Sequence, residues 1–190
     1  MNLRELLRRI FAGRNESVSV SIQFGSGYDA RMDMPARVAK LKELCDKIVS
    51  EESLNSRDIT GDGKPETFCN MALNYVAEKM GCTLLKGKLA NEIHEYCQSK
   101  TDEFDIVRHE KAAQLAMTGA LCFASLPVSN GSGHVATVYP LEMVDSPSLN
   151  RRVPWLANVG KPPNGIKPAS ACFPVYRYDS ITWFVWRPSV

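Results

Sequence analysis

The spacing of the hydrophobic residues changes near residue 120, and this change limits what the chain can fold into. Before it, apolar residues recur every three or four positions, as in amphipathic helices, in the segments 35–52, 67–82, 89–99 and 105–119. After it, they alternate or form short runs between turns rich in Gly, Pro, Ser and Asn, in the segments 120–126, 133–140, 153–160 and 180–188. Helices first and strands second predict an α+β fold with an antiparallel sheet.

Residues 1–54 are expected to form an N-terminal helical and extended segment that packs on the rest of the chain. Residues 1–17 place Leu, Ile and Phe at helical spacing against Arg, and residues 18–24 alternate as in a strand. This basic amphipathic helix could touch a membrane surface, but packing on its own domain is the simpler interpretation. The segment lacks the unbroken apolar stretch and cleavage site of a signal peptide, so we expect a cytoplasmic product.

Composition and charge exclude two classes of partner. The 23 basic and 21 acidic residues give a formal net charge of +2, without a basic stripe interleaved with aromatic residues, so nucleic acid is not expected. No window of about 18 apolar residues could span a membrane. Hydrophobic residues make up 44% of the 190 positions, which is enough for the core of one domain.

The six cysteines are expected to be reduced, and most of them to be small buried apolar side chains. They lie at wide, irregular intervals, at positions 45, 69, 82, 97, 122 and 172. A zinc site usually contains a close pair of cysteines. The nearest arrangement here, His94 with Cys97, has no second pair nearby, so zinc is not expected.

Residues 58–69, DITGDGKPETFC, have the oxygen spacing of a calcium-binding loop. The candidate ligands are Asp58, Thr60, Asp62, the backbone carbonyl of Lys64, and Glu66. Gly63 takes the sixth position, where such a loop turns sharply, but the twelfth position holds Cys69 instead of a bidentate Glu. The alternative is an ordinary Asp/Gly turn whose side chains bond their own backbone.

Cys69 is the candidate nucleophile because it falls in the first turn of the helix predicted at 67–82, with Thr67 near its N-cap. The positive end of a helix dipole favours the thiolate. A nucleophilic thiol needs an imidazole as base, and the chain has three histidines. His94 and His109 lie on predicted helices, whereas His134 opens a strand after two glycines. We therefore pair Cys69 with His134.

The third member of such a site is a polar group that fixes the tautomer of the imidazole. Asn158 lies on the next predicted strand, which would bring it near His134 if the two strands are adjacent and antiparallel. Asn164 and Asp145 are competitors, but both lie in surroundings rich in Pro, Gly and Ser, where a role in a turn is usual.

The order of these segments resembles the NlpC/P60 and CHAP family of papain-like amidases and endopeptidases. The resemblance is carried by TFCNMALNYVAEKMG, GALCFASLPVSNGSGHVATVYP and PWLANVG, of which SGHVATV is the most specific part. It implies a papain-like catalytic domain over residues 55–190, with Cys69 as nucleophile, His134 as general base and Asn158 as orienting residue. The insertion LEMVDSPSLNRRVP makes the spacing from His134 to Asn158 longer than the family usually shows.

The resemblance implies a thiol hydrolase that cleaves an amide bond of bacterial peptidoglycan, as an endopeptidase or an N-acetylmuramoyl-L-alanine amidase. The backbone N–H of Cys69 would help to bind the oxyanion. Several CHAP endolysins carry a calcium loop directly before the cysteine, which is the arrangement seen in this sequence. The expected contexts are a phage lysin released by a holin or carried by the virion, or an antibacterial effector exported by a dedicated machine. The alternatives are a cysteine protease or deamidase acting on protein, and a non-catalytic calcium-binding module.

Overall fold

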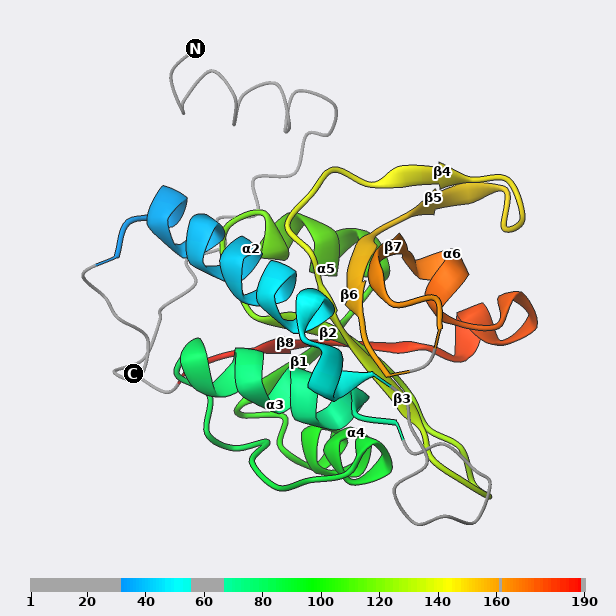
Figure 1. Ribbon diagram of the computed structural model, residues 1–190, viewed down its shortest axis with the longest axis horizontal. Coiled ribbons are helices and arrows are strands. Elements are labelled where there is room, and N and C mark those ends of the chain that lie inside the picture. Colours follow the sequence, from blue (N-terminus) through cyan, green and yellow to red (C-terminus); the bar gives the residue numbers. More distant parts are fainter. Residues whose placement is uncertain (1–31, 56–66, 161, 189–190) are drawn as a thin grey trace.

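An antiparallel sheet forms the centre of the fold, with helices on both of its faces (Figure 1). The computed structural model describes residues 32–55, 67–160 and 162–188. The expected helix and strand within residues 1–24 and the calcium-like segment 58–66 lie outside these residues. In the part of the chain that the structure describes, none of the helices has the length and hydropathy of a membrane-spanning segment.

The α-helices are α2 (Met34–Ser50), α3 (Cys69–Lys79), α4 (Ala90–Ser99), α5 (His109–Ala116) and α6 (Ala169–Cys172), and the 3-10 helices are η1 (Glu52–Leu54) and η2 (Val175–Ser180). The strands are β1 (Phe104–Val107), β2 (Cys122–Leu126), β3 (His134–Val138), β4 (Val144–Ser146), β5 (Arg151–Val153), β6 (Trp155–Asn158), β7 (Gly165–Pro168) and β8 (Thr182–Trp186). Within the described residues, one sheet has the order β1-β8-β2-β3-β6-β7, and β4 and β5 form a separate pair. Every pairing in both sheets is antiparallel, which confirms the predicted α+β class with an antiparallel sheet.

Contacts of two histidines show that helices cover opposite faces of the sheet. His94 of α4 contacts Ser125 of β2 and Phe184 of β8. Trp183, the neighbour of Phe184, points to the other face, where His109 of α5 contacts it. Figure 1 accordingly shows α3 and α4 on one side of β8 and β1, with α5 on the other.

Helix α2 begins where the sequence predicts, because Asp33 caps it. The Asp33 carboxylate accepts a hydrogen bond from the backbone N–H of Ala36 at 2.9 Å, and Pro35 occupies the first turn. The buried face of α2 belongs to the same hydrophobic core as the sheet, through Leu41, Leu44, Cys45 and Ile48. The boundary proposed at residue 54 stays a prediction.

Two regions differ from the sequence-based expectation. The helix predicted from Asp105 starts only at His109, because residues 104–107 form β1 and pair with β8 at the edge of the sheet. The insertion 141–154 folds largely as the β4–β5 hairpin, outside the main sheet. It therefore lengthens the chain between β3 and β6 while leaving these strands adjacent.

Candidate active site

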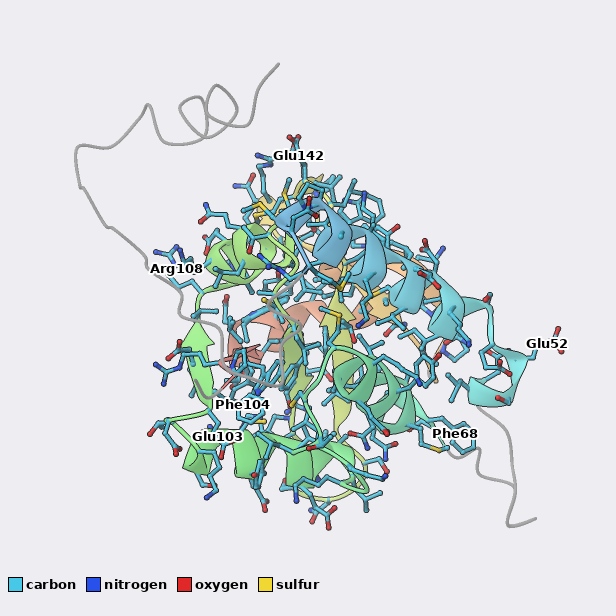
Figure 2. All side chains as sticks on the ribbon, turned by 90° about the vertical axis from the view of Figure 1, so that its left-hand side faces the viewer. Glu52, Phe68, Glu103, Phe104, Arg108 and Glu142 are labelled. Carbon is cyan, nitrogen blue, oxygen red and sulfur yellow. The ribbon has the colours of Figure 1, made fainter. Side chains whose placement is uncertain are left out.

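Cys69 is the first residue of α3, and its side chain is buried, with 3% of its surface exposed. Phe68 occupies the N-cap position predicted for Thr67, and no side chain caps the helix there. Figure 2 shows Phe68 at the end of α3 where the chain enters this helix.

Burial raises the pKa of the Cys69 thiol above its ordinary value of 9.0. Hydrogen bonds from the backbone of Val135 and Asn70, and from the side chain of Thr67, act in the opposite direction but are smaller effects. The lowered pKa that the sequence predicts from the helix terminus is therefore not found, because burial is the largest effect on this thiol. The bond from Val135 also shows that the sulfur lies beside β3, one residue from His134.

His134 is the first residue of β3, and Asn158 and Phe173 contact its imidazole. Its Nε2 atom lies 2.7 Å from the Oδ1 atom of Asn158. The ring centroid of Phe173 lies 5.1 Å from that of His134, in a tilted arrangement. Phe173 is itself 3% exposed, so it forms an apolar wall against the imidazole.

The register of the sheet explains how Asn158 reaches His134. In the β3–β6 pair, Thr137 lies opposite Ala157 and Val138 opposite Leu156. Continuing this register sets Asn158 opposite Ala136, so His134 is its diagonal neighbour on the same face of the sheet. The expectation that adjacent antiparallel strands would bring these two side chains together is confirmed.

The hydrogen bonds of Asn158 define the tautomer of His134. Asn158 is 1% exposed, and its Nδ2 atom donates to the carbonyl oxygen of Pro163 at 2.7 Å. Because that carbonyl can only accept, the amide oxygen of Asn158 must face His134. The Nε2 atom of His134 therefore carries the donated proton, and in the neutral ring Nδ1 keeps its lone pair.

Gly160 brings the β6–β7 connection against the start of α3. A Cβ atom at Gly160 would lie 3.0 Å from the backbone nitrogen of Phe68 and 3.1 Å from that of Cys69. The residue also has a φ of 96°, which favours glycine. This close approach places the chain that follows Asn158 next to the amide proposed to bind an oxyanion.

Asp145 and Asn164, the alternatives to Asn158 as orienting residue, contact other parts of the structure. Asp145 lies in β4, not in a loop, and its register partner is Arg152 in the β4–β5 hairpin. The Nδ2 atom of Asn164 donates to the side-chain oxygen of Asn55. Neither contact involves His134.

The other two histidines have different surroundings. His94 is buried on α4, its Nδ1 atom lies 3.2 Å from the hydroxyl of Ser125, and burial lowers its pKa. The Nε2 atom of His109 lies 3.2 Å from the backbone carbonyl of Arg152. All six cysteine thiols are free.

The structure does not describe the candidate calcium ligands Asp58, Thr60, Asp62, Lys64 and Glu66. Elsewhere, within residues 32–55, 67–160 and 162–188, no group of three or more His, Cys, Asp or Glu side chains is arranged to hold a metal ion. The calcium site stays a prediction from the sequence spacing.

Several residues of the site were not singled out from the sequence. Phe173 and Pro163 lie in Pro-rich segments after the strand that carries Asn158, where periodicity gives no signal. The signal for Gly160 was its place at the end of the strand segment 153–160. None of these three could be linked to Cys69 or His134 without the sheet register.

No family model matches the chain, and no curated protein matches it.

Proposed function

We propose that this protein is a papain-like thiol hydrolase that cleaves an amide bond in the peptide part of bacterial peptidoglycan. The observation that carries the proposal is the 2.7 Å contact between His134 Nε2 and Asn158 Oδ1, beside a cysteine at the start of a helix. This contact keeps the lone pair of a base on Nδ1 of His134, next to the strand that borders the thiol. The choice of peptidoglycan as substrate rests on the sequence resemblance.

In the first step, Nδ1 of His134 takes the proton of the Cys69 thiol while the sulfur attacks the carbonyl carbon of the amide. The backbone N–H of Cys69 stabilises the oxyanion of the tetrahedral intermediate. The C–N bond then breaks, and the amine leaves with the proton from His134. A thioester on Cys69 remains.

In the second step, His134 takes a proton from water, whose oxygen attacks the thioester carbonyl. The C–S bond breaks, the carboxylic acid product leaves, and Cys69 regains its proton. Asn158 keeps the imidazole in the tautomer that both steps need and stabilises the imidazolium that forms within each step, between uptake and release of the proton. A thiol with a raised pKa fits this scheme, because the base acts during the attack and no thiolate is required beforehand.

Digestion of purified peptidoglycan, followed by mass analysis of the soluble fragments, tests the proposal and names the bond that is cut. The Cys69→Ala variant should lose activity by about 10⁴-fold or more while keeping the thermal unfolding transition of the wild type. Cys172→Ala is the matched control, because Cys172 is the partly exposed thiol and bonds the backbone carbonyls of Lys167 and Pro168. It should retain full activity.

Two results would contradict the proposal. Hydrolysis by Cys69→Ala would move the nucleophile to another residue. Cleavage of an unfolded protein substrate by the wild type, with peptidoglycan left intact, would keep the thiol chemistry but replace the substrate class with protein.

A further inference from the structure

One side chain of α4 holds the β2–β3 connection, residues 127–133, which leads directly into His134. The Nδ2 atom of Asn91 donates to the backbone carbonyl of Val128 at 2.9 Å and to that of Gly131 at 3.1 Å. Its Oδ1 atom accepts from the backbone N–H of Val128 at 3.1 Å. The amide thus bonds the connection with both its donor and its acceptor atoms.

The backbone at Gly133, one residue before His134, lies directly against the same amide. A Cβ atom at Gly133 would stand 2.3 Å from the Oδ1 atom of Asn91 and 3.0 Å from the carbonyl oxygen of Leu126. A side chain at this position would have to displace the Asn91 amide from its bonds with the connection. The connection and Asn91 therefore fit each other closely at the position that precedes the imidazole.

The connection is also anchored at both of its ends. Leu126 and His134 are register partners in the β2–β3 pair. Arg177 of η2 donates to the carbonyl of Pro127 at 2.9 Å. Asn91 of α4 bonds the middle of the segment, at the carbonyl oxygens of Val128 and Gly131.

We propose that Asn91 is a positioning residue for His134, which fixes the β2–β3 connection so that the imidazole stays in its bond with Asn158. This inference rests on the proposed thiol hydrolase function. Asn91 acts through the backbone that carries His134, so its removal should slow the chemical step more than it weakens substrate binding.

The test compares Asn91→Ala with Gln98→Ala, which removes an exposed amide from the same helix. In peptidoglycan hydrolysis, Asn91→Ala should lower kcat about tenfold or more with KM changed less than about twofold, and Gln98→Ala should change neither. A second readout needs no substrate: the NMR signal of the His134 Nε2 proton, which the bond to Asn158 shifts downfield, should weaken or move in Asn91→Ala. Absence of hydrolysis by the wild type would refute the proposed function, while this signal would still decide the role of Asn91.

Gly133→Ala tests the same contact from the side of the connection, because its methyl group would push against the Asn91 amide. It should reduce kcat in the wild-type background. In the Asn91→Ala background the reduction should be smaller, because the shortened side chain makes room for the new methyl group. Asn91→Asp sets a carboxylate oxygen against the carbonyl oxygens of Val128 and Gly131, which cannot donate, so its kcat should fall at least as far as that of Asn91→Ala. A folded Asn91→Ala with the kcat and the His134 signal of the wild type would overturn the proposal, as would loss of folding in both Asn91 variants, which would assign Asn91 to stability alone.

Discussion

The Nε2 atom of His134 lies 2.7 Å from the Oδ1 atom of Asn158, and the Nδ2 atom of the same amide lies 2.7 Å from the carbonyl oxygen of Pro163. One amide therefore bonds a fixed acceptor on one side and presents its oxygen to the imidazole on the other. The carbonyl of Pro163, five residues beyond Asn158, therefore decides which ring nitrogen of the neutral His134 carries the proton.

Replacing Asn158 with Ala should lower kcat partly, without abolishing hydrolysis. In the transition state Asn158 accepts a hydrogen bond from an imidazolium, and such a charged bond contributes about 1.5–3 kcal/mol, or about 10- to 150-fold in rate. Rates of peptidoglycan hydrolysis measure the effect. Asn164→Ala is the control, because this amide lies in the same connection but bonds Asn55. Full activity of Asn158→Ala would move the orienting role to another residue.

The raised pKa of Cys69 predicts how its alkylation depends on pH. An acid whose pKa is raised keeps its proton to higher pH, so below that pKa the thiolate fraction is smaller than in a free cysteine and grows with pH. Labelling of Cys69 by iodoacetamide, followed by mass spectrometry of its peptide, should accelerate about tenfold per pH unit between about pH 6 and 8. A rate that stays constant over this window would reveal a preformed thiolate and contradict the raised pKa of Cys69.

The main elements near the site were predictable from the sequence because their periodic patterns are long or lie between clear turn signals. Helices α2, α3 and α4 and strands β2, β3, β6 and β8 were identified in this way. Strand β1 was missed because its four residues, 104–107, continue into a helical pattern, and its pairing with β8 depends on a segment about eighty residues away.

The sequence predicted which residue types the candidate site contains, but not their environment. Cys69, His134 and Asn158 could be ordered along the chain from the residue types that such chemistry needs. The pKa of Cys69 could not be predicted, because burial is a product of tertiary packing and raises the pKa, against the lowering expected at a helix start. The role proposed for Asn91 depends on contacts that span 37 and 40 residues, which no local pattern encodes.

Gly160→Ala should reduce both stability and activity. The residue has a φ of 96°, where a side chain costs about 1–2 kcal/mol, and the new Cβ would press on the backbone nitrogens of Phe68 and Cys69. Gly87→Ala is the matched control, since Gly87 also has a positive φ of 76° but has nothing within 4 Å of the added atom. Urea unfolding should show a loss of stability in both variants, larger in Gly160→Ala because of its added contacts, and hydrolysis should fall only in Gly160→Ala. Wild-type activity in that variant would exclude a close fit at the Cys69 amide.

Calcium should stabilise the wild type if the segment before Cys69 binds it. Binding to the native state alone contributes about 2.7 kcal/mol at a hundredfold excess over Kd. Because Cys69 replaces the closing Glu, we expect a weak site, with Kd of about 10⁻⁴–10⁻³ M, and poor replacement by magnesium, which requires a tighter octahedron. Melting curves with chelator and with added calcium measure the effect on the wild type and on Asp62→Ala, with Asp102→Ala as the control carboxylate. A wild-type melting temperature that is the same in chelator and in calcium would show that residues 58–66 form an ordinary Asp/Gly turn.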